Sequence, residues 1–79
     1  MYRETRVPLL CTYDEEADAA YIYLSHPLAP GSVQRTATVD ATDVTVNVDF
    51  NAEGHAVGIE ILGAGTRLPP SLRQAITRS

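Results

Sequence analysis

Five polar and aromatic residues offer the best set of groups for chemistry in this sequence. Each projects from the polar side of a segment whose alternate positions are apolar: Tyr21, Tyr23, Asn47, Asp49 and Glu60. If these segments neighbour one another, two phenols lie beside carboxylates and an amide, which suits binding of a small molecule or a partner. The simpler interpretation, which we favour, is that the tyrosines form cross-strand pairs that stiffen a sheet.

The remaining reactive side chains do not combine into a catalytic set. Cys11 alternates with Leu9 and Tyr13, so we interpret it as a small apolar residue of the core rather than a nucleophile. His26 and His55 stand in loops, apart from each other. The sequence therefore predicts no catalytic residue and no cofactor, and it favours a protein that is not an enzyme.

A run of acidic residues resembles the first half of a calcium-binding loop. Asp14, Glu16 and Asp18 occupy alternate positions, but Ala19 and Ser25 stand where such a loop needs glycine and glutamate. We interpret the run as a solvated hairpin turn in which Asp14 caps the backbone that follows it. No metal site is expected.

Alternation of apolar and polar residues predicts the elements that position these groups. The pattern is clearest at 44–50, and Asn51 to Gly54 reads as a type I turn that ends on a glycine suited to positive φ. We expect strands over Leu9–Tyr13, Ala19–Ser25, Val33–Val39, Val44–Phe50 and Ala56–Leu62. The fold class is α+β: an antiparallel β-meander of four to five strands with one short C-terminal helix, in a single domain over 1–79 with its core at 9–62.

The C-terminal segment 68–78 differs from the rest in composition. Ser71 and Gln74 fit a capping box for a helix over 71–78, with Arg78 near its end. A helix this short needs a docking surface, because it is unstable alone in water. We therefore expect this tail to bind a partner through Leu68, Leu72, Arg73 and Ile76.

Composition restricts the partners. The 79 residues carry ten acidic side chains, six arginines and no lysine, for a net charge of -4, which argues against direct nucleic-acid binding. The chain has no apolar run long enough to cross a bilayer, no expected export signal and a single cysteine, so we expect a cytoplasmic protein without a membrane partner. The apolar side of the sheet is too broad for one short helix, which predicts a homo-oligomer, most simply a two-fold dimer.

Two sequence motifs resemble those of a known family. The segments 13–24 and 46–62 resemble the small-protein family named domain of unknown function 2283, which has the pattern Tyr-Asp-x-x-x-Asp-Ala-x-Tyr-Ile followed by Val-Gly-Ile-Glu-Ile. The matching residues are Tyr13, Asp14, Asp18, Ala19, Tyr21, Ile22, Gly54, Val57, Gly58, Ile59, Glu60 and Ile61. The resemblance implies no activity, but it implies a role as an antitoxin or partner of a small toxin-like protein.

Two hypotheses for the function follow. The first is a non-catalytic protein-interaction module, the acidic half of an antitoxin-like pair with a basic protein partner. The alternative is a small ligand-binding protein or enzyme that uses the tyrosine and carboxylate face of the sheet.

Overall fold

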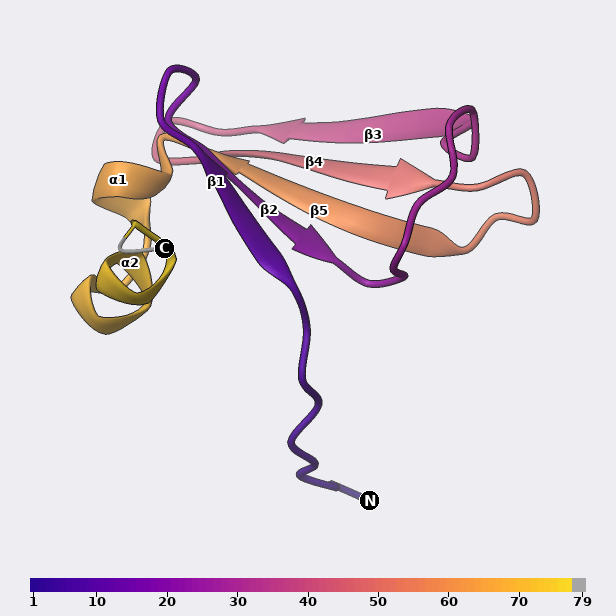
Figure 1. The fold of residues 1–79 in the computed structure, drawn as a ribbon, viewed down its shortest axis with the longest axis horizontal. Helices are drawn as coiled ribbons and strands as arrows, with labels where there is room; N and C mark the ends of the chain where they lie inside the picture. The colour runs from indigo at the N-terminus through magenta and orange to yellow at the C-terminus, as the bar shows by residue number, and fades with distance from the viewer. Residues whose placement is uncertain (78–79) are drawn as a thin grey trace.

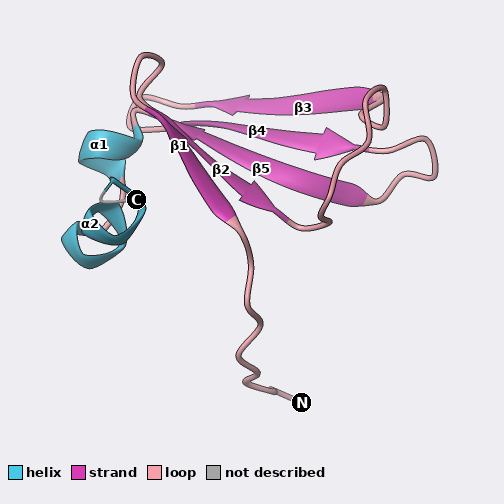
Figure 2. Cartoon of the chain, viewed as in Figure 1, coloured by secondary structure: helices cyan, strands magenta, loops and turns pink. Residues whose placement is uncertain are grey.

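The structure of the protein is a computed structural model, and it describes residues 1–77. Within these residues, five strands form one sheet, and two helices gather at one end of it, beside β1 and β2 (Figures 1 and 2). The elements are β1 Cys11–Asp14, β2 Ala19–Tyr23, β3 Arg35–Asp40, β4 Thr45–Phe50, β5 Ala56–Leu62, α1 Ala64–Arg67 and α2 Pro70–Thr77. The α+β class and the five-stranded antiparallel sheet with a short C-terminal helix are confirmed.

The strand order is β1-β2-β5-β4-β3, and every neighbouring pair is antiparallel. The chain therefore departs from strict sequential order at one place, because β2 pairs with β5 and not with β3. The segment 24–34 makes the connection, and it carries the breaks Pro27, Pro30 and Gly31. As a result, β5 lies at the centre of the sheet, and β1 and β3 form its two edges (Figure 1).

The turn between β4 and β5 forms as the sequence predicts. Gly54 has a φ of 83°, and its N–H donates to the carbonyl of Asn51 at 3.0 Å. The Asn51 side chain adds two bonds, because its Oδ1 accepts from the backbone N–H groups of Glu53 and His55 at 3.0 and 2.9 Å. The bounds of β5 agree with the predicted strand at both ends. The other strands begin or end one or two residues from their predicted limits.

The acidic run is a hairpin turn whose first carboxylate caps the backbone. Asp14 Oδ1 accepts from the N–H groups of Glu16 and Ala17 at 3.0 and 3.2 Å. This is the Asx-turn geometry that the sequence predicts.

The C-terminal helical region differs from the prediction in two respects. A short additional helix, α1, precedes α2. The expected cap at Ser71 is wrong, because α2 begins at Pro70 and the carbonyl that accepts from Arg73 N–H, at 2.9 Å, belongs to Pro69. Proline suits the first helical position, since its fixed φ fits the helix and its missing N–H would have no helical partner there. Arg78 lies outside the described residues.

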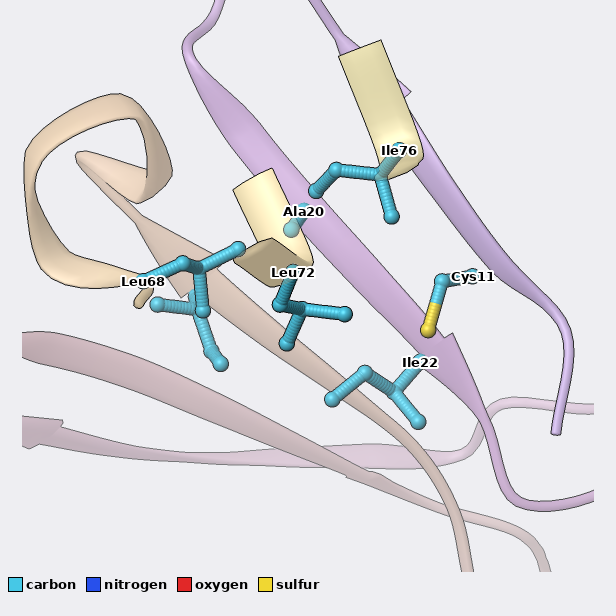
Figure 3. A pocket seen from close by; sticks show the side chains of 7 residues that line it. Cys11, Ala20, Ile22, Leu68, Leu72 and Ile76 are labelled. Carbon is cyan, nitrogen blue, oxygen red and sulfur yellow. The ribbon is translucent and has the colours of Figure 1, made fainter. Parts of the chain in front are cut away.

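The sheet has one apolar face, and α2 covers only part of it. The register aligns the apolar residues of all five strands on this face: Cys11, Tyr13, Ala20, Ile22, Ala37, Val39, Val46, Val48, Phe50, Ile59 and Ile61. Figure 3 shows Leu68, Leu72 and Ile76 pointing toward Cys11, Ala20 and Ile22 around a narrow apolar space. Cys11 thus has apolar surroundings, although it is half-buried.

The rest of the apolar face lies outside the space that α2 lines, and it is covered incompletely: Val57 is buried, but its neighbours on this face are not. We call this region the open half of the apolar face; it consists of Ala37, Val39, Val46, Val48, Phe50 and Ile59. None of these six side chains is buried, and Val39 is 59% exposed.

Candidate functional site

The sheet brings all five candidate residues together on its other, polar face. Tyr21 stands opposite Glu60, which in turn stands opposite Asn47, while Tyr23, Gly58 and Asp49 form the next row. β3 extends both rows, with Thr38 opposite Asn47 and Thr36 opposite Asp49. The predicted juxtaposition of phenols, carboxylates and an amide is therefore present.

The Tyr21 phenol crosses β5 to reach a carboxylate on β4. Its hydroxyl donates to Asp49 Oδ2 at 2.7 Å, and Thr36 Oγ1 donates to Asp49 Oδ1 at 2.6 Å. This path exists because residue 58 is glycine: a Cβ there would overlap the Tyr21 phenol. Gly58 thus provides the space in which the aromatic ring lies.

A second chain of hydrogen bonds runs parallel to the first. Thr38 Oγ1 donates to Asn47 Oδ1 at 2.6 Å, and Asn47 Nδ2 donates to Glu60 Oε1 at 2.8 Å. At the end of β3, Thr45 Oγ1 donates to Asp40 Oδ1 at 2.7 Å. Together the two chains and this bond form what we call the polar ladder, which links β2, β5, β4 and β3. Its members are Tyr21, Thr36, Thr38, Asp40, Thr45, Asn47, Asp49 and Glu60.

The surroundings of Tyr21 keep its hydroxyl protonated, so that it acts as a hydrogen-bond donor. Burial raises the pKa of the Tyr21 phenol, and the hydrogen bond to Asp49 raises it further, because both favour the protonated form. Tyr21 therefore remains neutral and cannot act as a base near neutral pH. The groups of the polar ladder bond to one another, so the arrangement serves first to hold the strands in register.

Tyr23 has a different role from the cross-strand pair that the sequence suggested. Its ring lies edge-on to that of Tyr21, its neighbour along β2, with ring centroids 4.8 Å apart. The His26 ring packs against Tyr23 in the same manner at 5.3 Å. Aromatic contact thus runs along β2 and into the following loop, while the link across strands is the bond from Tyr21 to Asp49.

A second cluster, which sequence reasoning missed, joins the first hairpin to α1. Asp18 Oδ1 accepts from the Tyr13 hydroxyl at 2.6 Å and from the Gly65 N–H at 2.9 Å. The Asp18 carbonyl accepts from the Ala64 N–H at 3.0 Å. A Cβ at residue 65 would lie 2.8 Å from Asp18 Oδ1, so glycine allows this close approach.

These contacts also set the ionisation of the pair. The hydrogen bond from Tyr13, followed by that from Gly65, lowers the pKa of the Asp18 carboxyl. The same bond to Asp18 raises the pKa of Tyr13. The only signal in the sequence was the pair of words Tyr-Asp-x-x-x-Asp and Gly-Ala-Gly, and neither shows which residues meet.

The predicted partner-binding tail contacts the chain's own sheet. Leu68, Leu72 and Ile76 line the apolar space beneath the helix (Figure 3). Arg73 Nη1 donates to the carbonyl of Gly65 at 2.9 Å, which fixes α2 relative to α1. In this arrangement the tail completes the fold.

Metal sites and membrane-spanning helices are both absent from residues 1–77. No group of three or more His, Cys, Asp or Glu side chains in this range is placed to hold a metal ion. In the same range, no helix has the length and apolar character needed to cross a membrane.

The family model for proteins of unknown function, DUF2283, matches residues 11–64, which is more than half of the chain. The chain belongs to the DUF2283 family. Comparisons with curated proteins and with solved structures found no match. The structure explains both DUF2283 motifs of this chain. The first sequence motif contains Tyr13 and Asp18, whose side chains form a hydrogen bond. The second motif contains Gly58, over which the Tyr21 ring lies.

Proposed function

We propose that this DUF2283 protein is a non-catalytic protein-interaction module that acts as a two-fold homodimer through the open half of its apolar face. The observation that carries the proposal is the incomplete cover of this face. Five of its six side chains lie half-buried and Val39 is exposed, although all six occupy the positions that a β-sheet normally turns toward its core.

The accessible surface supports the same conclusion. The chain exposes 6054 Å², whereas a compact monomer of this mass exposes about 4,700 Å². Part of the excess belongs to the exposed residues 1–10. Packing of two such sheets face to face would produce a sandwich with a shared core.

The negative charge of the chain supports a role as the acidic protein in a complex with a basic partner protein. The net charge of -4 would attract a basic protein, and the family resemblance points to an antitoxin-like role.

We place the protein in the cytoplasm, since its single cysteine has no partner for a disulfide. We assign partner contact to the sheet rather than to the tail, because the apolar side chains of the tail already contact the sheet. No specific observation favours a ligand on the polar face, where the donors bond to neighbouring side chains.

The oligomeric state tests this proposal. Light scattering on the full chain at high micromolar concentration should give the mass of a dimer. Val39→Asp should shift the protein to a monomer without unfolding it, because this side chain is already 59% exposed within one chain. Thr12→Asp provides the matched control, since Thr12 is exposed on the polar face. A wild-type monomer, or a Val39→Asp variant that dimerises like wild type, would refute the proposed interface.

A further inference from the structure

β3 presents a free edge whose outward backbone groups can be identified from the register. Ala41 and Val44 exchange both of their backbone hydrogen bonds across the tight turn, at 2.9 and 3.4 Å. Bonded and non-bonded pairs alternate in an antiparallel ladder, so residues 35, 37 and 39 bond to β4. The N–H and C=O groups of Thr36, Thr38 and Asp40 therefore point away from the sheet.

This edge has charged residues only at its two ends, Arg35 and Asp40, and lacks the other usual protection against strand pairing. β3 has six residues, contains no proline or lysine, and is exposed at every position except Ala37. The strand at the opposite edge, β1, is shorter, with four residues, and α2 packs against its apolar side. An extended segment would therefore find its best template at β3.

The strand is already held in a conformation that can accept a partner. Thr36 and Thr38 bond to Asp49 and Asn47 on β4, and Asp40 accepts from Thr45. These bonds link the non-bonded pairs of the ladder, where facing side chains approach most closely. A segment that pairs with β3 would thus order little of this chain on binding, which favours affinity.

The side chains beside the edge define the chemistry of the partner. On the polar face, Asp40, Asp49 and Glu60 accept bonds from neutral donors, which leave their negative charges uncompensated. The one arginine of the sheet, Arg35, lies on the other face, with its guanidinium 4.2 Å from the centre of the Phe50 ring. On that face Ala37 and Val39 offer apolar contact.

We infer that the β3 edge binds an extended segment of a partner protein, in which cationic side chains alternate with apolar ones. The backbone of the segment adds a sixth strand through Thr36, Thr38 and Asp40. Its cationic side chains lie on the polar face near Asp40 and Asp49, and its apolar side chains continue the apolar face beside Val39. The backbone groups of this edge lie in the plane of the sheet, outside the proposed dimer interface, although Ala37 and Val39 border both; the inference does not depend on the dimer.

A designed peptide tests the inference on the full-length protein. The probe is a short capped peptide in which every second residue is valine. The residues between the valines are, in order, arginine, threonine and arginine, so both arginines lie on one face of the strand and the valines on the other. Its binding should shift the amide NMR signals of Thr36, Thr38 and Asp40 and slow their hydrogen exchange. Added salt should weaken the complex. A peptide with glutamate in place of arginine should bind at least about tenfold more weakly.

Two variants separate the backbone contact from side-chain effects. Thr38→Pro removes an outward N–H that β4 does not use, so affinity should fall by at least about tenfold while the sheet persists. Thr38→Val loses the same hydroxyl but keeps the N–H, and should bind like wild type. If the proline variant does not fold, a peptide methylated on the nitrogens that face β3 gives the equivalent test and should not bind.

Other results would overturn the inference. These are equal binding of the arginine and glutamate peptides, full binding by Thr38→Pro, or shifts confined to other strands. Protection of the Thr36, Thr38 and Asp40 amides that rises with protein concentration, without peptide binding, would show that β3 of a second copy occupies the edge. The peptide test can be interpreted whether or not the dimer test succeeds, because the peptide contacts β3 of one chain.

Discussion

The hydroxyl of Tyr21 on β2 donates to Asp49 on β4 at 2.7 Å, across the intervening strand β5. The bond joins β2 to β4 over β5, and Gly58 on β5 makes room for it. It therefore connects the first hairpin to the second through a side chain, in addition to the backbone ladder.

Substitution of Gly58 by alanine should destabilise the fold by about 1–2 kcal/mol, because the new Cβ displaces the phenol from Asp49. Chemical denaturation measures the change in the free energy of unfolding. The control is the double variant with Tyr21→Ala, in which the alanine at 58 should have little further effect. Equal costs of Gly58→Ala in both backgrounds would show that the ring and the glycine are not coupled.

The raised pKa of Tyr21 predicts a loss of stability in alkali. A phenol whose pKa is higher in the folded state contributes stability that is complete below about pH 10 and is lost as the pH rises further. The difference in unfolding free energy between wild type and Tyr21→Phe should therefore shrink above that pH. Tyr2→Phe, at a residue that is 87% exposed, should show no such trend.

The lowered pKa of Asp18 predicts the opposite dependence in acid. A carboxyl group whose pKa is lower in the folded state contributes stability that is present above its unfolded pKa and is lost as the pH falls through the folded value. Wild type should melt above Asp18→Asn at neutral pH, and the two melting temperatures should converge below about pH 4. Glu15→Gln removes a charge from the same turn and serves as the control. A difference in melting temperature between wild type and Asp18→Asn that stays constant at all pH values would contradict the stabilising role of the Asp18 carboxylate.

The reactivity of Cys11 should report on the docking of α2, because Leu72 and Cys11 line the same apolar space. Leu72→Ala should increase the rate at which a thiol reagent modifies Cys11 several-fold, as the cover over the sulfur loosens. Gln74→Ala, at an exposed position of the same helix, should leave the rate unchanged. An unchanged rate in Leu72→Ala would mean that α2 does not control access to the thiol.

The sequence predicted the strands and their two faces because alternation is a local property. The bounds of β5 and the shared face of Tyr21, Asp49 and Glu60 follow directly from it. The pairing of β2 with β5 could not be predicted this way, since an alternating strand accepts several neighbours. The sequence also gave no sign of α1, whose first N–H groups bond to Asp18, some 47 residues earlier.

The position of β5 between β2 and β4 has a consequence for how the chain folds. Each hairpin closes over a few residues, but the seam between β2 and β5 joins residues about forty positions apart. Loop-closure entropy opposes such distant contacts until both hairpins exist. The seam should therefore form last, so substitutions in the already formed turn at Asn51 to Gly54 should slow folding, whereas substitutions that weaken only the seam should mainly speed unfolding.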